Sequence, residues 1–226
     1  MSKIKIIDGN PHILFEQKIE VSNIEKGAGD FFKLMDSRRS VRDFSDKPVP
    51  KPVIENIIKT ASTAPSGAHK QPWTFCVVES AEMKSQIRVA AEEEEKKSYD
   101  GRMSEEWLKD LKPLGTNHLK PFLEIAPYLI IVFKKPYDLG ENGEKLQNYY
   151  VNESVGIACG MLITAIHQAG LVTLTHTPSP MNFLTKLLER PSNERAFLLL
   201  PVGYPDIEAY VPDIERKGLG EVSKFY

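Results

Sequence analysis

Cysteine is scarce in this sequence of 226 residues, which contains only Cys76 and Cys159. Each lies in an apolar run, which favours two buried free thiols in a reducing compartment. The two cysteines do not form a CxxC motif, and the histidines are not spaced as metal ligands, so the sequence predicts no metal site.

A surplus of charge and a long hydrophobic stretch are also absent. The formal net charge is only −2, so neither nucleic acid nor a membrane surface is expected as a partner. The longest apolar runs, such as 128–133, have the length of a strand and are too short to cross a bilayer. The first residues lack the apolar core and cleavage site of a secretory signal, so we expect a cytoplasmic protein.

Two fingerprints of common enzyme classes are missing as well. No Gly-x-Gly-x-x-Gly motif occurs, which argues against a dedicated nicotinamide-binding domain. The sequence does not exclude a Ser-His-Asp triad, but no nucleophile-elbow motif supports one. Hydrolases and classical dehydrogenases are therefore not favoured.

The length and the 41% hydrophobic content are those of one globular domain. Weak periodicity predicts an N-terminal arm over 1–29, with Asp30 or its neighbours capping the first helix. Residues 30–226 are expected to form a single domain. It includes a highly charged lid segment at about 85–120 and a C-terminal arm over 206–226.

Hydrophobic periodicity predicts helices and strands within one core. Apolar residues at helical spacing indicate a helix from Val53 to Ala61, and a second helix over 152–168 is apolar on nearly every side. Strands are predicted at 73–79, 128–134 and 196–202, and a further strand at 171–175. Such mixing favours an α+β or α/β fold.

Two polar segments carry the first chemical signals. Arg38, Arg39 and Arg42 suit a phosphate, although arginines at a helix end also interact favourably with its dipole. Between Pro65 and Pro72, small residues let a ligand approach the backbone N–H groups, although an ordinary helix-to-strand loop looks the same. Together they indicate a phosphorylated planar cofactor, and therefore an enzyme.

A second set of residues suggests a substrate site. Glu95 and Tyr99 are four residues apart and share one helical face, although a solvated charge run with a surface tyrosine is an equal alternative. The neighbouring Glu92–Glu94 make the choice of carboxylate depend on register. Thr175 and Thr177 follow a predicted strand, where ligand contacts are common; β propensity explains Thr177 poorly because Pro178 ends the strand.

These motifs resemble those of the nitroreductase superfamily of FMN-dependent homodimers. The resemblance runs from about Phe31 to Glu221 and is carried by Arg38-Arg39-Ser40-Val41-Arg42, Ala64–Trp73 and Val202-Gly203-Tyr204-Pro205. Three further features resemble the iodotyrosine deiodinase branch: Glu95 with Tyr99, Lys120 after Thr116-Asn117, and Thr173–Pro178.

The resemblance implies an α+β fold, a three-layer α-β-α sandwich with a mixed, mainly antiparallel central sheet, in an intertwined homodimer. It also implies FMN as the cofactor. The implied FMN contacts are Arg38, Arg39, Ser40, Arg42, Pro65, Ser66, Gly67, Thr175, Thr177 and Arg216. Among these, the resemblance implies a catalytic role for Thr177, whose hydroxyl donates a hydrogen bond to flavin N5 and favours one-electron steps.

The implied reaction is reductive dehalogenation of halogenated tyrosines, converting iodotyrosine to tyrosine and iodide. Glu95 is expected to bind the substrate ammonium and Lys120 its carboxylate, with Tyr99 as a wall and the Ala68 N–H on the phenolate. NAD(P)H, or a reductase or flavodoxin-type partner, is expected to supply electrons. The alternatives are a general NAD(P)H-dependent nitroreductase or quinone reductase using hydride transfer, and a non-catalytic flavin-binding protein.

Overall fold

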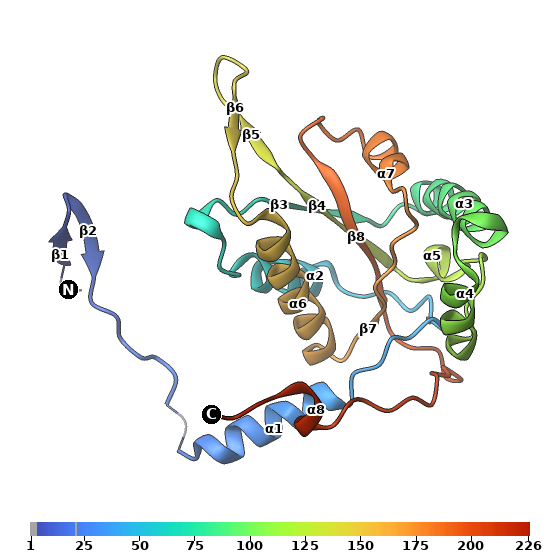
Figure 1. Cartoon of the computed structure of the whole chain (residues 1–226), viewed down its shortest axis with the longest axis horizontal. Coiled ribbons are helices and arrows are strands. Elements are labelled where there is room, and N and C mark those ends of the chain that lie inside the picture. The colour runs from blue at the N-terminus through green and yellow to red at the C-terminus, as the bar shows by residue number, and fades with distance from the viewer. Residues whose placement is uncertain (1–3, 21) are drawn as a thin grey trace. The chain divides into compact units, whose positions relative to one another are not determined.

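The structure is a computed structural model that describes residues 4–20 and 22–226 (Figure 1). The chain divides into two units, one ending at Ser37 and the other comprising Arg38–Tyr226. None of the described helices is both long and apolar enough to cross a bilayer.

The first unit contains a short antiparallel hairpin, β1 (Ile4–Ile7) and β2 (Asn10–Ile13), and helix α1 (Ile24–Asp36). The helix begins six residues before the predicted Asp30, because the Asn23 side chain accepts a hydrogen bond from the Lys26 N–H at 2.9 Å. The prediction of a cap at Asp30 was therefore wrong. No residue of β1, β2 or α1 is buried, so the described part of this unit forms no hydrophobic core of its own.

A four-stranded sheet organises the second unit. Its strands are β3 (Trp73–Val78), β4 (Tyr128–Lys134), β8 (Arg195–Gly203) and β7 (Val172–Thr173), in that spatial order. All three pairings are antiparallel. The sheet was expected to be mixed, but the parallel pairing among the described residues is a single isolated bridge between Ser40 and Thr173. This bridge places the arginine motif beside the edge strand β7.

Helices cover both faces of this sheet (Figure 1). One face carries α2 (Lys51–Ser62) and α6 (Val151–Gln168), and the other carries α3 (Ala81–Lys97), α5 (Phe122–Ile125) and α7 (Asn182–Leu187). This arrangement confirms the predicted three-layer α+β sandwich.

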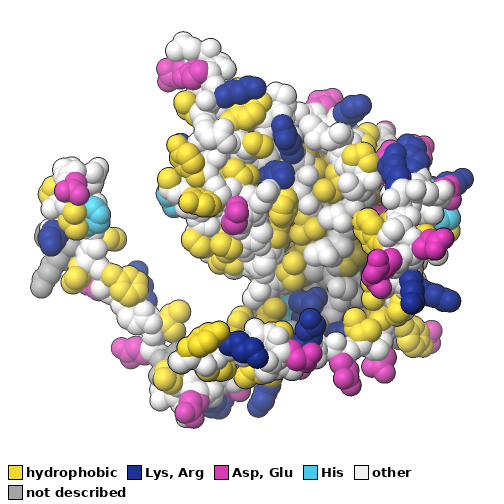
Figure 2. Space-filling view, viewed as in Figure 1, with side chains coloured by type: hydrophobic (Ala, Val, Ile, Leu, Met, Phe, Trp, Pro, Cys, Tyr) yellow, Lys and Arg dark blue, Asp and Glu magenta, His cyan; other side chains and the backbone are white. Residues whose placement is uncertain are grey.

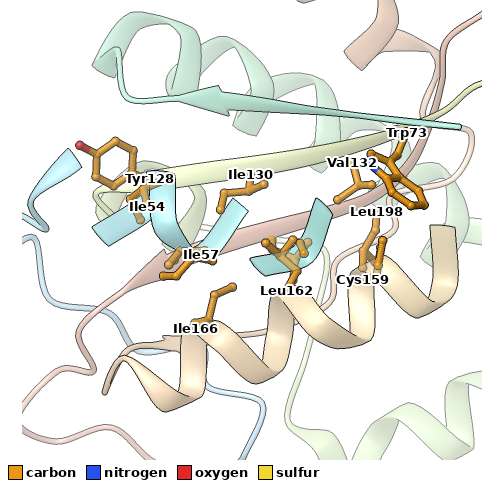
Figure 3. Packing of buried hydrophobic residues seen from close by; sticks show 14 of the residues in the cluster. Ile54, Ile57, Trp73, Tyr128, Ile130, Val132, Cys159, Leu162, Ile166 and Leu198 are labelled. Carbon is orange, nitrogen blue, oxygen red and sulfur yellow. The ribbon is translucent and has the colours of Figure 1, made fainter. Parts of the chain in front are cut away.

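The central strand β4 explains why two cores form. Its side chains alternate between the faces, as strand geometry requires. Ile130 and Val132 join the core with α2 and α6, whereas Leu129, Ile131 and Phe133 join the opposite one. Figure 3 shows the first core, in which residues of α2 and α6 meet the strand; the labelled examples are Ile54, Ile57, Leu162 and Ile166. Burial of these side chains on both faces holds the sheet rigidly between its helices.

The segment expected to form a lid, at about 85–120, includes most of α3 and the elements that follow it. These following elements are the π-helical turn η2 (Ser98–Arg102), α4 (Glu105–Leu111) and the 3-10 turn η3 (Lys112–Leu114). The remaining elements are η1 (Gly67–His69), the hairpin β5 (Tyr137–Leu139) and β6 (Lys145–Gln147), and α8 (Leu219–Val222).

The C-terminal arm is tied to the segment that follows Arg42. The Asp206 N–H donates to the Asp43 carbonyl at 3.0 Å, and the Tyr210 N–H donates to Asp43 Oδ2 at 3.1 Å. Phe44 and Pro205 form a bridge between the same segments. The arm is thereby led past the arginine motif, where it completes a cavity.

Candidate active site

Arginine side chains from two distant parts of the chain line a cavity of about 310 Å³. Arg216, in the C-terminal arm, donates a hydrogen bond to the Arg38 carbonyl at 2.8 Å, and the Arg39 guanidinium donates to the Pro212 carbonyl. The full lining is Arg38, Arg39, Ser40, Arg42, Leu114, Pro212, Ile214, Glu215 and Arg216. The structure thus brings together the five predicted phosphate-side residues.

The electrostatics of this cavity favour an anion. Burial lowers the pKa of Arg38, and the charges of Arg216 and Arg39 lower it further. Only one carboxylate, that of Glu215, is among the described residues lining the cavity. A phosphate would relieve the repulsion between these guanidinium groups through charge-assisted hydrogen bonds.

A second cavity, of about 140 Å³, adjoins the first, and Arg42 lines both. Five predicted residues meet there: Glu95 from α3, Tyr99 from η2, Lys120 just before α5, and Thr175 and Thr177 after β7. The other lining residues are Met103, Trp107, Leu111, Thr116, Phe122, Leu174 and His176.

Glu95 and Lys120 form a buried ion pair at the centre of this second cavity. Lys120 Nζ lies 3.4 Å from Glu95 Oε2, and their side chains are only 5% and 12% exposed. Lys120 Nζ also donates to Thr116 Oγ1 at 3.2 Å and to the Asn117 carbonyl. Burial raises the pKa of Glu95 and lowers that of Lys120, although each charge partly opposes the shift of the other. The carboxylate chosen by the resemblance is therefore the one that meets Lys120's ammonium.

Tyr99 forms a wall beside this pair. Its hydroxyl donates to the Thr116 carbonyl at 3.3 Å, and Lys120 Nζ lies 5.9 Å from the centre of its ring. Burial is the main cause that raises the pKa of Tyr99, so the phenol stays protonated and available as a hydrogen-bond donor.

Thr175 and Thr177 are exposed on the cavity side, while His176 between them is buried. His176 exchanges backbone hydrogen bonds with Leu199 at 2.9 and 3.0 Å, which fixes this segment although β7 ends earlier than predicted. Its Nδ1 lies 4.0 Å from Glu95 Oε1. Burial, with smaller contributions from the Lys120 and Arg42 charges, lowers the pKa of His176 to about 3, so the ring is neutral.

The predicted cradle Pro65–Ala68 lies elsewhere. Figure 1 shows the turn between α2 and β3 on the opposite side of the second unit from α3 and α4. The Gly67 N–H donates to Ser154 Oγ at 3.3 Å, and Ser66 Oγ accepts from the Gln71 N–H at 2.9 Å. None of Pro65, Ser66, Gly67 and Ala68 lines either cavity. Within one chain, the structure does not bring the cradle to the other predicted residues.

Sequence reasoning missed two groups of cavity residues. Met103, Trp107 and Leu111 line the second cavity. Trp107 and Leu111 lie four residues apart in α4, whereas Met103 precedes that helix in extended backbone, so helical periodicity alone does not reveal all three. His176 was considered only among the histidines whose spacing excludes a metal site, and the alternation of threonine, histidine and threonine after a strand was the signal for its burial.

The fold and the site define a class: an α+β sandwich with an anion-binding arginine cavity next to a buried carboxylate–ammonium pair. The sequence profile of the nitroreductase family matches residues 35–204. The iodotyrosine deiodinase of Haliscomenobacter hydrossis is 63% identical over 199 residues, which are 88% of this chain and 90% of that protein. The human iodotyrosine deiodinase 1 is 49% identical over 198 residues, 87% of this chain and 68% of that protein.

A solved structure agrees with these relatives. Oxidized iodotyrosine deiodinase bound to FMN and 3-iodo-L-tyrosine superposes with a TM-score of 0.73 at 32% identity, covering 86% of this chain and all of that one. The chain belongs to the nitroreductase family, in its iodotyrosine deiodinase branch. The family resemblance inferred from the motifs is therefore confirmed.

Proposed function

We propose that this protein is an FMN-dependent oxidoreductase that removes halogen from halotyrosines, giving tyrosine and halide. The observation that carries the proposal is the buried Glu95–Lys120 pair, separated from the arginine cavity by the shared residue Arg42. The names of the relatives and the ligands of the solved deiodinase structure support it.

The residues of the first cavity fit the phosphate of FMN. Four guanidinium groups line it, and a phosphate would balance their charges. Burial is the main cause that lowers the pKa of Arg38, and the charges of Arg216 and Arg39 add to this effect. When bound, reduced FMN would supply two electrons; with one proton taken up, the carbon–halogen bond would be replaced by a carbon–hydrogen bond and the halogen would leave as halide. Thr175 and Thr177 present hydroxyls to the adjoining cavity, and we assign to Thr177 the hydrogen bond to flavin N5.

The second cavity fits the amino-acid end of the substrate. The substrate ammonium replaces Lys120 as the partner of Glu95, and the substrate carboxylate replaces Glu95 as the partner of Lys120. Both buried charges stay paired during this exchange, which avoids the cost of an isolated charge. Tyr99 closes one side of the cavity and helps exclude water from the reacting ring.

We further propose an intertwined homodimer in which a second copy supplies the cradle Pro65–Ala68. The distance of this turn from the cavities of its own chain supports the proposal (Figure 1). Figure 2 shows hydrophobic side chains on the face of the second unit that carries α6, where Ile157 and Tyr150 are 47% and 73% exposed. In α1, Phe31 and Phe32 are likewise exposed.

Complementation between two inactive chains tests the homodimer. A chain carrying Lys120→Ala and a chain carrying Gly67→Asp are each expected to be inactive alone. Co-expressed, they should recover about a quarter of wild-type activity if they pair at random, since one site in each mixed dimer keeps both intact parts. No recovery, with mixed dimers present, contradicts the shared site.

Within this proposal the electrons come from NAD(P)H or from a reductase or flavodoxin-type partner, and the protein acts in the cytoplasm. The deciding experiment supplies FMN-loaded protein with a reductant and 3-iodotyrosine, and measures iodide and tyrosine. We expect the two products in equal amounts. Reduction of nitroaromatics without any iodide release would favour a general nitroreductase instead.

A further inference from the structure

Two carboxylates near the end of α3 hold Lys120 in different ways. Glu95 pairs with the Lys120 ammonium, whereas Glu92 Oε1 accepts a hydrogen bond from the Lys120 backbone N–H at 2.6 Å. Residues three apart share a helical face, so both carboxylates point toward the same loop. One therefore contacts the charge of Lys120, and the other contacts the backbone that carries it.

Glu92 is itself held in place. Arg88 Nε donates to Glu92 Oε1 at 2.8 Å, and the same guanidinium reaches Glu124 Oε2 in α5 at 3.1 Å. One turn earlier, buried Lys84 donates to the carbonyls of Glu124 and Ala126, each at 2.9 Å. One face of α3 thus binds the whole segment from Lys120 to Ala126.

The hydrogen bonds keep Glu92 ionised. Burial alone would raise its pKa, but the Lys120 N–H and the Arg88 side chain outweigh this effect, and the pKa is lowered. The neighbouring carboxylates differ: Glu94 pairs with Lys97 and Arg102, and the exposed Glu93 side chain has no hydrogen bond or ion pair among the described residues. The run of glutamates is therefore not one uniform solvated face.

We propose that Glu92 is a positioning residue for the substrate clamp, the Glu95–Lys120 pair that binds the two charges of the substrate. Glu92 acts through the Lys120 backbone N–H to fix the Lys120 ammonium opposite Glu95. This inference rests on the proposed halotyrosine function. The other partners of Lys120 Nζ, Thr116 and Asn117, belong to the same loop and move with it. When a substrate separates Glu95 from Lys120, the Glu92 hydrogen bond still joins Lys120 to α3.

The test compares FMN-loaded wild type with Glu92→Ala, Glu92→Gln and the control Glu93→Ala. For 3-iodotyrosine, Glu92→Ala is expected to raise KM about tenfold, with kcat within about threefold and the Kd for FMN within about twofold of wild type. Glu92→Gln should lie between Glu92→Ala and wild type, because its amide oxygen still accepts from Lys120. Glu93→Ala should behave as wild type.

Two results overturn the assignment: an unchanged KM in Glu92→Ala and Glu92→Gln, or a loss of FMN affinity in proportion to the rise in KM. The second result would mean that Glu92 only supports the fold. Failure of the proposed function is a separate result, seen when wild-type protein itself neither binds 3-iodotyrosine nor releases iodide. Where Glu92→Ala does not fold, Glu92→Gln decides.

Discussion

The ammonium of Lys120 lies 3.4 Å from the carboxylate of Glu95, although both side chains are almost completely enclosed. Desolvation of two charges costs more than such a pair usually returns, so a buried ion pair is weak evidence for stability. Under the proposed function, the pair is explained by a ligand that carries both charges itself. A zwitterionic amino acid matches each residue with an opposite charge.

If this explanation holds, substitutions of the pair should affect stability and ligand binding differently. Lys120→Met is expected to lower the free energy of unfolding by about 3–5 kcal/mol, because it leaves Glu95 buried and unpaired. The double variant Glu95→Gln/Lys120→Met should recover most of that loss. Halotyrosine affinity should fall about tenfold or more in both. Denaturant unfolding and ligand titration measure the two quantities, and recovery of affinity in the double variant would contradict the clamp.

The pH dependence of halotyrosine binding should reflect the ionisation of both clamp residues, Glu95 and Lys120. Glu95 must be ionised, and its raised pKa moves the acid loss of affinity to higher pH than for an ordinary glutamate. Lys120 must be protonated, and its lowered pKa moves the alkaline loss to lower pH. A plot of affinity against pH should therefore be a bell-shaped curve that is narrower than ordinary Glu and Lys side chains would give. Glu95→Gln should flatten the acid side and, because the Glu95 charge raises the pKa of Lys120, move the alkaline loss to a still lower pH. Ionisation of the free substrate affects both proteins equally.

The lowered pKa of the buried His176 ring should make the stability of the protein depend on pH. Its pKa of about 3 in the folded protein is below the ordinary 6.5, so the unfolded chain binds the proton more readily. Stability is retained above pH 6.5 and lost by about 1.4 kcal/mol per pH unit as the pH falls toward 3. Unfolding free energies of wild type and His176→Gln should diverge accordingly between pH 7 and 5. Parallel pH curves would show that His176 does not resist protonation.

Local motifs made part of this site predictable from the sequence. Arg38, Arg39 and Arg42 lie within one short segment, and the buried strand 128–134 has an unmistakable apolar run. The strand was located correctly, as β4 shows, and the three arginines line one cavity. The helix start at Asn23 was missed because its cap has no apolar run behind it to mark it.

Long-range contacts set the limit of sequence reasoning. Glu92, Glu93, Glu94 and Glu95 look alike in a charged helix, and only the folded structure distinguishes them. Glu92 and Glu95 meet Lys120, whereas Glu94 pairs with Lys97 and Arg102. The same holds for the turn 65–71, where Ala68, His69 and Gln71 adopt positive φ values that their residue types do not favour. Tertiary structure imposes these conformations, so composition alone does not reveal them.

Gly67 tests the role of that turn. A Cβ at this position would lie 2.8 Å from the Tyr149 carbonyl oxygen and 3.0 Å from Tyr150 Cδ2. Gly67→Ala should therefore displace the turn, cost about 1–3 kcal/mol of stability and weaken FMN binding. Gly29→Ala, where a Cβ meets open space, is the control. Wild-type FMN affinity in Gly67→Ala would remove this turn from the cofactor site.

The arginine cavity predicts how FMN is held. Arg38→Ala or Arg39→Ala should raise the Kd for FMN about 10–100-fold, since a hydrogen bond to a charged group contributes about 1.5–3 kcal/mol. Added salt should weaken FMN binding by wild type more than by either variant, because screening acts on charges that the variants lack. Arg195→Ala, an exposed arginine at the start of β8, is the matched control. If all three variants bind FMN as wild type does, the phosphate is bound elsewhere, and Arg42 no longer links the cofactor to the Glu95–Lys120 pair.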